Sequence, residues 1–152
     1  MKYIYAILFL IFGPSAVAQT IGLHTISVHQ KSTYDWCKYN TGGNRTCEKK
    51  YNNTNLGLYY IHESGATVGG YRNSYGKNTL YAGYTASTQD FHGLSAVATF
   101  ALATGYSSLY GVGVLRPVIA PGLRFTMGSV AMRYTFVPGK EGFQHLSLEY
   151  KL

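Results

Sequence analysis

Three polar residues are the strongest candidates for chemistry in this chain: His29, Asn73 and Ser74. Acyl transfer needs a nucleophile or an activated hydroxyl, a base that takes its proton, and donors for the oxyanion that develops. Ser74 can supply the hydroxyl and His29 the base, while the amide of Asn73 can donate a hydrogen bond but cannot act as a base. The alternative is a rim of polar side chains without chemistry, as found at membrane–water boundaries.

Basic and aromatic residues lie close to Ser74 in the chain. Arg72 precedes it, and Tyr75 and Lys77 follow it. Guanidinium and ammonium groups bind phosphate oxygens, so this segment could hold the phosphate of a lipid head group. The open alternative is that these side chains only contribute to the polar rim.

The remaining histidines do not predict a metal site. His24 lies five residues before His29, which puts the two side chains on opposite faces of a regular strand. The others, His62, His92 and His145, are scattered at strand ends, where a structural or interfacial role is expected. We therefore expect neither a metal nor any other cofactor.

Segments in which apolar and mixed residues alternate with a period of two must position these candidates. In the last of them, Leu146, Leu148 and Tyr150 alternate with Ser147 and Glu149, which is typical of a strand with one apolar face. Turn residues separate the segments. We expect eight strands, at residues 21–31, 54–63, 66–74, 79–88, 93–105, 112–126, 130–137 and 143–152.

Two stretches interrupt this regular pattern. Residues 32–53 form a long, basic connection between the first two strands. Pro117 and Pro121 fall within the sixth segment, and because proline cannot donate to a sheet ladder, they predict weak or interrupted pairing there. The composition otherwise suits strands and tight turns, since the 152 residues include 15 Tyr and 18 Gly and only 12% are charged.

The first residues predict a secretory signal. An apolar run at residues 3–12 follows Lys2, and Ala16-Val17-Ala18 is a small-x-small cleavage site. A membrane anchor is the alternative, but the run is well short of the roughly 20 residues that a spanning helix needs. We expect a signal peptide at residues 1–18 and one barrel domain at residues 19–152.

Secretion also bears on the cysteines. Cys37 and Cys47 are the only 2 in the chain. In an oxidising compartment we expect them to form a disulfide, and they are too few for a zinc site.

Eight antiparallel strands behind a signal peptide predict an all-β, eight-stranded antiparallel outer-membrane β-barrel. With both ends on the periplasmic side, the connections at 32–53, 75–78, 105–111 and 138–142 face outward, and the short turns near 64, 90 and 128 face the periplasm. A secreted sandwich or small soluble barrel also shows alternation, but outward tyrosine and leucine residues favour the membrane. We expect a monomer in the bacterial outer membrane.

The interior and the charge of the barrel suggest a lipid partner. A barrel of this size holds side chains or one small ligand. The runs at 94–102 and 112–120 are apolar on both faces, which fits either a packed core or a cavity for an acyl chain. Residues 31–50 carry five basic and two acidic side chains, a net charge of +3, which would attract anionic head groups. Lipopolysaccharide and phospholipid are therefore the expected partners, and nucleic acid is not.

Several segments, taken in order, resemble the lipid A palmitoyltransferases of the PagP type. Tyr71-Arg72-Asn73-Ser74-Tyr75 is similar to the Phe-Lys-Asp-Ser-Trp of that family, and Ser27-Val28-His29 to its Thr-Trp-His. Further similar segments are Tyr51-Asn52-Asn53 with Gly57-Leu58, Ala82-Gly83-Tyr84, Leu115 to Pro121, and Phe136-Val137-Pro138-Gly139. The resemblance extends over nearly all of the chain after the signal. Small barrel proteins carried by bacteriophages and prophages share the same arrangement.

The resemblance implies an eight-stranded outer-membrane enzyme that moves a palmitoyl chain from phospholipid to lipid A. The histidine and serine of the family site fall on His29 and Ser74, and its aspartate falls on Asn73. A glycine that sets the depth of the acyl pocket falls on Thr85, where a larger side chain would shorten the pocket. Because an amide cannot carry the acid's charge, the resemblance supports the fold better than the activity.

Three functions follow from these observations. The leading one is a lipid-modifying acyltransferase that uses His29 and Ser74. The alternative is a surface barrel without enzymatic activity that binds lipopolysaccharide or masks a phage receptor, which the amide of Asn73 favours. The third is a phospholipase-like hydrolase that uses the same rim.

Overall fold

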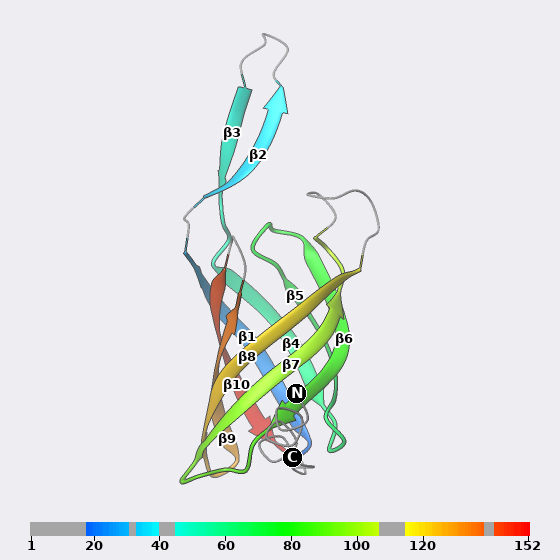
Figure 1. Ribbon diagram of the computed structural model, residues 1–152, viewed down its shortest axis with the longest axis vertical. Coiled ribbons are helices and arrows are strands. Elements are labelled where there is room, and N and C mark those ends of the chain that lie inside the picture. Colours follow the sequence, from blue (N-terminus) through cyan, green and yellow to red (C-terminus); the bar gives the residue numbers. More distant parts are fainter. Residues whose placement is uncertain (1–17, 31–32, 40–44, 107–114, 139–141) are drawn as a thin grey trace, which may run out of the picture.

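The computed structural model is a closed antiparallel barrel of eight strands (Figure 1). It describes residues 18–152 except 31–32, 40–44, 107–114 and 139–141, and it describes only the backbone of residues 33–39 and 45–49. The strands of the barrel are β1 (Thr20–His29), β4 (Thr54–Ile61), β5 (Ala66–Arg72), β6 (Asn78–Ser87), β7 (Leu94–Ala103), β8 (Arg116–Met127), β9 (Val130–Val137) and β10 (Phe143–Lys151). Each strand pairs with the next along the chain, and β1 closes the barrel on β10. The predicted fold class is confirmed.

The connection at 32–53 contains more structure than the sequence predicts. It holds a separate two-stranded hairpin of β2 (Thr33–Tyr39) and β3 (Arg45–Lys50), which extends from one end of the barrel in Figure 1. β1 begins and β10 ends at the opposite end, where Thr20 pairs with Lys151. We call the two halves of the barrel the hairpin-side half and the terminus-side half.

The backbone of the hairpin brings the two cysteines across from each other. Cys37 and Cys47 lie directly beside the Lys38–Thr46 pair of the β2–β3 ladder. Their side chains are outside the described part of the structure, so the disulfide stays a prediction. The predicted signal peptide, residues 1–18, lies almost wholly outside the described residues.

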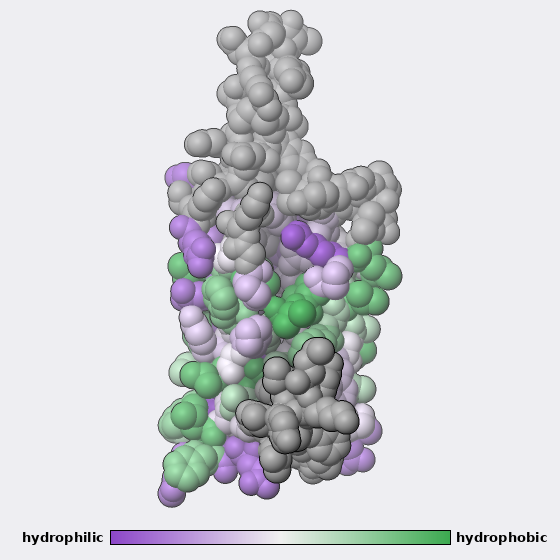
Figure 2. Space-filling view, viewed as in Figure 1, coloured by the Kyte–Doolittle hydropathy of each residue, from purple (hydrophilic) through white to green (hydrophobic). Residues whose placement is uncertain are grey.

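The outer wall of the barrel is apolar and its interior is polar. Along β9, for example, Val130, Met132 and Tyr134 are exposed, whereas Ala131 and Arg133 are buried. Figure 2 shows hydrophobic residues spread over the wall, with hydrophilic residues gathered toward its two ends. This reversal of the usual soluble pattern is typical of a barrel surrounded by lipid. In the described part of the chain, no helix has the length and apolar character needed to cross a bilayer.

A β-bulge in β1 corrects the prediction for the two histidines of that strand. The register of β1 against both of its neighbours shifts between His24 and Ile26. Because a bulge adds one residue to one strand, it reverses which residues point inward beyond it. His24 and His29 therefore both face the interior, and the expectation of opposite faces is wrong.

The prolines of β8 interrupt pairing on one side only. β8 pairs with β7 from Arg116 to Phe125, including Pro117 and Pro121. Its pairing with β9 begins at Gly122, opposite Thr135. The segment of β8 before Gly122 therefore lies beside the end of β9 without a ladder between them, in the hairpin-side half of the wall.

Polar side chains fill the terminus-side half of the interior. Glu149 is 3% exposed and lies between two buried guanidinium groups, at 3.7 Å from Arg124 and 3.6 Å from Arg133. The phenol of Tyr59 donates to the same carboxylate at 2.7 Å. A buried carboxylate needs such partners, because an unpaired charge in a dry interior is very unfavourable. We call Glu149, Arg124, Arg133 and Tyr59 the charged cluster.

Candidate functional site: a cavity in the hairpin-side half

A cavity of about 550 Å³ occupies the hairpin-side half of the barrel. Its volume lies within the usual range of small-ligand sites. One wall consists of small and aliphatic side chains from β7, β8 and β9, and the opposite wall of rings from β1, β4, β5, β6 and β10. The aliphatic wall is formed by Ala101, Ala103, Val118, Ala120 and Val137, and the aromatic wall by His24, Tyr59, Tyr71, Tyr81, Phe143 and His145.

The charged cluster forms the floor of the cavity with the side that faces the hairpin-side half. Arg133 lines the cavity and donates from Nη2 to the hydroxyl of Thr99 at 2.6 Å. Ser147 stands directly across the β9–β10 ladder from Arg133, and its hydroxyl is 3.0 Å from the phenol of Tyr59. The deepest part of the cavity is thus polar and cationic, whereas one of its side walls is aliphatic.

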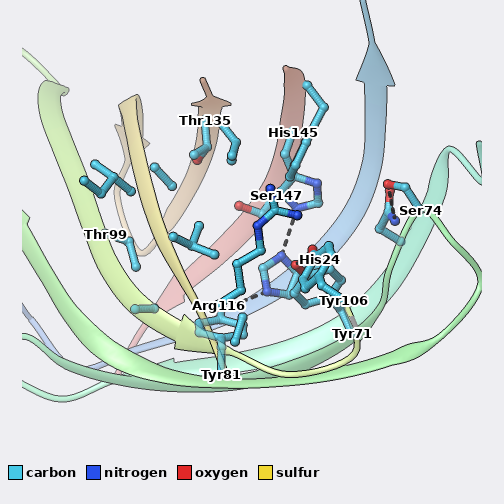
Figure 3. A pocket seen from close by; sticks show the side chains of 18 of the residues that line it. His24, Tyr71, Ser74, Tyr81, Thr99, Tyr106, Arg116, Thr135, His145 and Ser147 are labelled. Atoms are coloured by element: carbon cyan, nitrogen blue, oxygen red, sulfur yellow. Dashed lines mark hydrogen bonds between the residues drawn. The ribbon is translucent and has the colours of Figure 1, made fainter. Parts of the chain in front are cut away.

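A pair of histidines lies above this floor. His24 Nδ1 is 2.8 Å from His145 Nε2, and His24 Nε2 is 2.9 Å from the hydroxyl of Tyr81 (Figure 3). The ring of His24 also packs against Tyr59 and Tyr71, with centroids 4.7 and 4.9 Å apart. These contacts hold both imidazoles in place inside the barrel. Of the two roles expected for His145, structural or interfacial, the interior position fits the structural one.

A second polar contact closes the aromatic wall toward the mouth. The hydroxyls of Tyr71 and Tyr106 are 2.6 Å apart, and the guanidinium of Arg116 lies 5.7 Å from the centre of the Tyr106 ring. Burial raises the pKa of Tyr106, so this phenol stays neutral and can donate. Arg116 also lines the cavity, so it places a positive charge near the mouth.

His29 lies at the mouth, where the sequence predicted it. Its ring stacks on Tyr51 with centroids 4.0 Å apart and planes 6° from parallel, and Nδ1 is 3.3 Å from Asn53 Oδ1. The centroid of the Phe143 ring lies 5.3 Å from that of the His29 ring. His29 thus lies between two aromatic rings that also line the cavity.

Ser74 lines the same cavity but has a separate set of partners. Its hydroxyl is 3.5 Å from that of Ser27 and 3.4 Å from Asn55 Nδ2. Ser27 in turn donates to Asn55 Oδ1 at 2.5 Å. Neither Ser27 nor Asn55 can take a proton from Ser74. The structure brings His29 and Ser74 to one cavity, but the hydrogen bonds of the Ser74 side chain go to Ser27 and Asn55.

Asn73 has a structural role in the turn between β5 and β6. It is fully buried, and it is not among the residues that line the cavity. Its Oδ1 accepts from the backbone N–H groups of Tyr75 and Lys77 at 3.0 and 2.9 Å. Its Nδ2 donates to Thr79 Oγ1 and to the carbonyl of Gly105, both at 3.0 Å. Both amide hydrogens and the amide oxygen are thus engaged within the protein, and none points to a substrate.

Thr85 lies below the cavity rather than in it. Its hydroxyl is 2.8 Å from that of Thr67 and 2.8 Å from that of Thr99. Thr67 and Thr99 line the cavity, and Thr85, which is 1% exposed, supports them from behind. This position agrees with a residue that limits depth, but it gives Thr85 no direct contact with a ligand in the cavity.

The proposed phosphate-binding residues separate into two groups. Tyr75 lines the cavity, and its ring contacts Tyr51 and Tyr106 edge-on at 5.7 and 6.0 Å. Arg72 is exposed and lines a different, shallow hollow with Leu56, a residue of the apolar outer wall. Lys77 is half-buried beside the β5–β6 turn. Only Tyr75 of this group belongs to the cavity.

The sequence analysis missed the residues of the cavity floor, although the sequence contained a signal for them. Arg133 and His145 are on the mixed faces of their strands, and an apolar outer wall requires those faces to point inward. Tyr59, Tyr71 and Tyr81 are harder to recognise, because tyrosine occurs on both faces of such strands. The inward direction of His29 depends on the bulge, which no residue type in β1 announces.

Comparisons with known proteins bear on the fold alone. A solved structure from the de novo design of transmembrane β-barrels aligns with a TM-score of 0.58 and 13% identity over 91% of this chain and 98% of that one. No protein-family model matches the chain, and neither does any curated protein. Together with the apolar outer wall, the structural match identifies a membrane-type β-barrel of eight strands.

Proposed function

We propose that the protein is a barrel of the bacterial outer membrane that binds the acyl chain of a membrane lipid in its hairpin-side cavity without modifying it. The observation that carries this proposal is the aliphatic wall of a cavity of about 550 Å³. Such a wall keeps a chain's methylene groups in van der Waals contact with apolar atoms, as the bilayer interior does. The ligand expected is a lipid of the outer leaflet.

The gap in pairing between β8 and β9 supports a lipid ligand. The cavity-lining residues Val118 and Ala120 lie on the part of β8 that has no ladder to β9, and Val137 lies at the end of β9. A chain can pass between two strands more easily where no backbone hydrogen bonds join them. If both termini lie on the periplasmic side, as the sequence predicts, this gap faces the outer leaflet.

Acyl transfer is the second candidate, and one observation favours it. His29 and Ser74 line the same cavity, as the resemblance to the lipid A palmitoyltransferases implies. Two observations favour binding instead. Asn73, at the position of the family acid, uses its amide within a turn, and Ser74 hydrogen-bonds to groups that cannot act as a base.

Native mass spectrometry of the barrel, released from a nonionic detergent, tests chain binding. Ala101→Phe puts a ring into the cavity, whereas Leu102→Phe, the next residue on β7, changes only the outer wall, where Leu102 is 51% exposed. We expect lipid to remain on the wild type and on the Leu102 variant and to be lost from the Ala101 variant. Equal retention by both variants would contradict the proposal.

Mass spectrometry of lipid A tests the second candidate. Cells that express the wild type are compared with cells that express the His29→Ala, Ser74→Ala double variant. We expect the same lipid A in both, because the geometry favours binding. An added acyl chain that appears with the wild type and not with the double variant would establish acyl transfer at the rim and replace the first proposal.

A further inference from the structure

The charges around the cavity are of one sign. Among the described residues that line it, the side chains that always carry a charge are two arginines, and there is no aspartate or glutamate. Below the floor, Glu149 is shared by Arg124 and Arg133. Two guanidiniums, which are always protonated, therefore share one carboxylate, so the charged cluster carries one positive charge in excess.

Arg133 presents this excess charge to the cavity. Arg133 lines the cavity floor while Arg124 does not, and Arg133 is 5% exposed. A buried cation without a full complement of negative charge is unfavourable unless a ligand supplies that charge. An anionic group on the floor would also be next to Ser147 and Thr99, whose hydroxyls line the cavity at the same level.

Above the floor, the side chains that face the interior change from polar to apolar along the barrel axis. From Arg133 toward the mouth, the inward positions of β9 are Thr135 and then Val137. On β7 they change from Thr99 to Ala101 and Ala103. The cavity is thus cationic and polar at its deep end and increasingly apolar toward the gap between β8 and β9.

We infer that the cavity takes a single-chain amphiphile with an anionic end group, a carboxylate or a phosphate, and that the anionic end lies on the floor beside Arg133 with the chain running along the aliphatic wall to the mouth. This inference rests on the proposed function and specifies its ligand class. The opposite orientation would bury the chain end against Arg133 and the histidine pair and leave the excess charge without a partner.

Binding of matched amphiphiles to the wild-type barrel tests the charge requirement. Tetradecanoic acid, tetradecyl phosphate and tetradecanol have the same chain and differ in the end group, and isothermal titration in nonionic detergent at about pH 9 keeps the acid ionised. We expect at least one of the anions to bind about tenfold more tightly than the alcohol, the factor expected for a charge-assisted hydrogen bond. The better anion identifies the end group. Equal affinities for all three would overturn the inference.

Two charge-removing variants locate the anion. Arg133→Gln removes a positive charge at the floor, and Arg116→Gln removes one at the mouth. We expect the preference for the anion over the alcohol to fall to within about twofold in the Arg133 variant and to persist in the Arg116 variant. The reverse result would place the anionic end at the mouth and overturn the inference.

Spin-labelled fatty acids give the orientation in the wild type, in case the Arg133 variant does not fold. A label near the methyl end should broaden the amide resonances of Phe143 and Ala103 more than those of Ser147 and Thr99, and a label near the carboxylate should do the opposite. The reverse pattern would overturn the inference.

If the alcohol binds as tightly as the anions and Ala101→Phe abolishes all binding, the inference fails while the proposed function stands. If the wild type binds none of them, both fail.

Discussion

The two halves of the barrel interior are enclosed by the same strands, but different kinds of side chain face inward in each. In the terminus-side half, the ring of Tyr59 fills the space over Gly22, where an added Cβ would lie 2.0 Å from the ring, and the charged cluster occupies the centre. In the hairpin-side half, one wall carries small and aliphatic side chains, among them Ala101, Ala103 and Ala120. The cavity thus lies where alanines face rings across the barrel.

The two halves should also contribute differently, the terminus-side half to stability and the hairpin-side half to ligand binding. Side chains of the terminus-side half bond to each other, as Glu149 does with Tyr59 and both arginines. Side chains of the hairpin-side half form smaller groups, such as the histidine pair with Tyr81, the Tyr71–Tyr106 pair and the rim cluster around Ser74. Changes in the first region should therefore affect folding, and changes in the second should affect what the barrel binds.

Removal of the central carboxylate should have the largest effect. Glu149→Ala leaves Arg124 and Arg133 without their shared partner, and breaking a buried ion pair in this way costs about 3–5 kcal/mol of unfolding free energy. Urea titration of the refolded barrel in lipid vesicles, followed by heat-modifiable migration on a gel, measures this loss. The control is Val118→Ala in the cavity wall, for which we expect about 1 kcal/mol. Similar losses in the two variants would contradict the division into halves.

Restoring an acid at position 73 should destabilise the rim rather than create an enzyme. Asn73→Asp replaces the amide donor that bonds to the Gly105 carbonyl and to Thr79 by a second acceptor oxygen. Leaving such buried groups unpaired costs about 1–3 kcal/mol. We expect a lower urea midpoint and unchanged lipid A in cells. A gain of acyl transfer would show that the rim is an attenuated active site.

Substitution of Thr85, which joins Thr67 and Thr99 beneath the floor, should have a smaller effect. Thr85→Ala removes hydrogen bonds to Thr67 and Thr99, and we expect a loss of about 1–2 kcal/mol in unfolding free energy. Thr85→Ser, which keeps the hydroxyl, is the matched control and should lose less. Because Thr85 supports the floor without lining it, the affinity for the amphiphiles should change by less than about twofold. A larger change would place Thr85 in the binding site.

The positions of the strands were predictable because the membrane imposes a strong pattern on them. Alternation with a period of two places, for example, the predicted strand at 130–137 at the observed residues of β9. The hairpin of β2 and β3 was not predicted, because its polar, basic sequence lacks an apolar face. The predicted strand at 112–126 overlaps β8 (Arg116–Met127), and residues 112–114 lie outside the described part of the chain.

The site was predictable only in part, for physical reasons. His29, Ser74 and Tyr75 were correctly expected at one rim, because strand ends of the same side meet there. The role of Asn73 depends on a carbonyl of Gly105, more than thirty residues away, and local sequence does not contain that contact. The cavity itself depends on the difference in size between side chains on opposite walls, which requires knowledge of the strand order and register.

The most direct test of the account is whether a chain enters one half of the interior and not the other. Alanine methyl groups report on both halves, since Ala101, Ala103 and Ala120 line the cavity and Ala131 lies opposite Glu149 on the terminus side. Nuclear Overhauser contacts between these methyl groups and the methylenes of bound tetradecanoic acid can be measured on the selectively methyl-labelled wild type in detergent. The account predicts contacts to Ala101, Ala103 and Ala120 and none to Ala131. Contacts to none of the four, or to Ala131 as strongly as to the others, would contradict it.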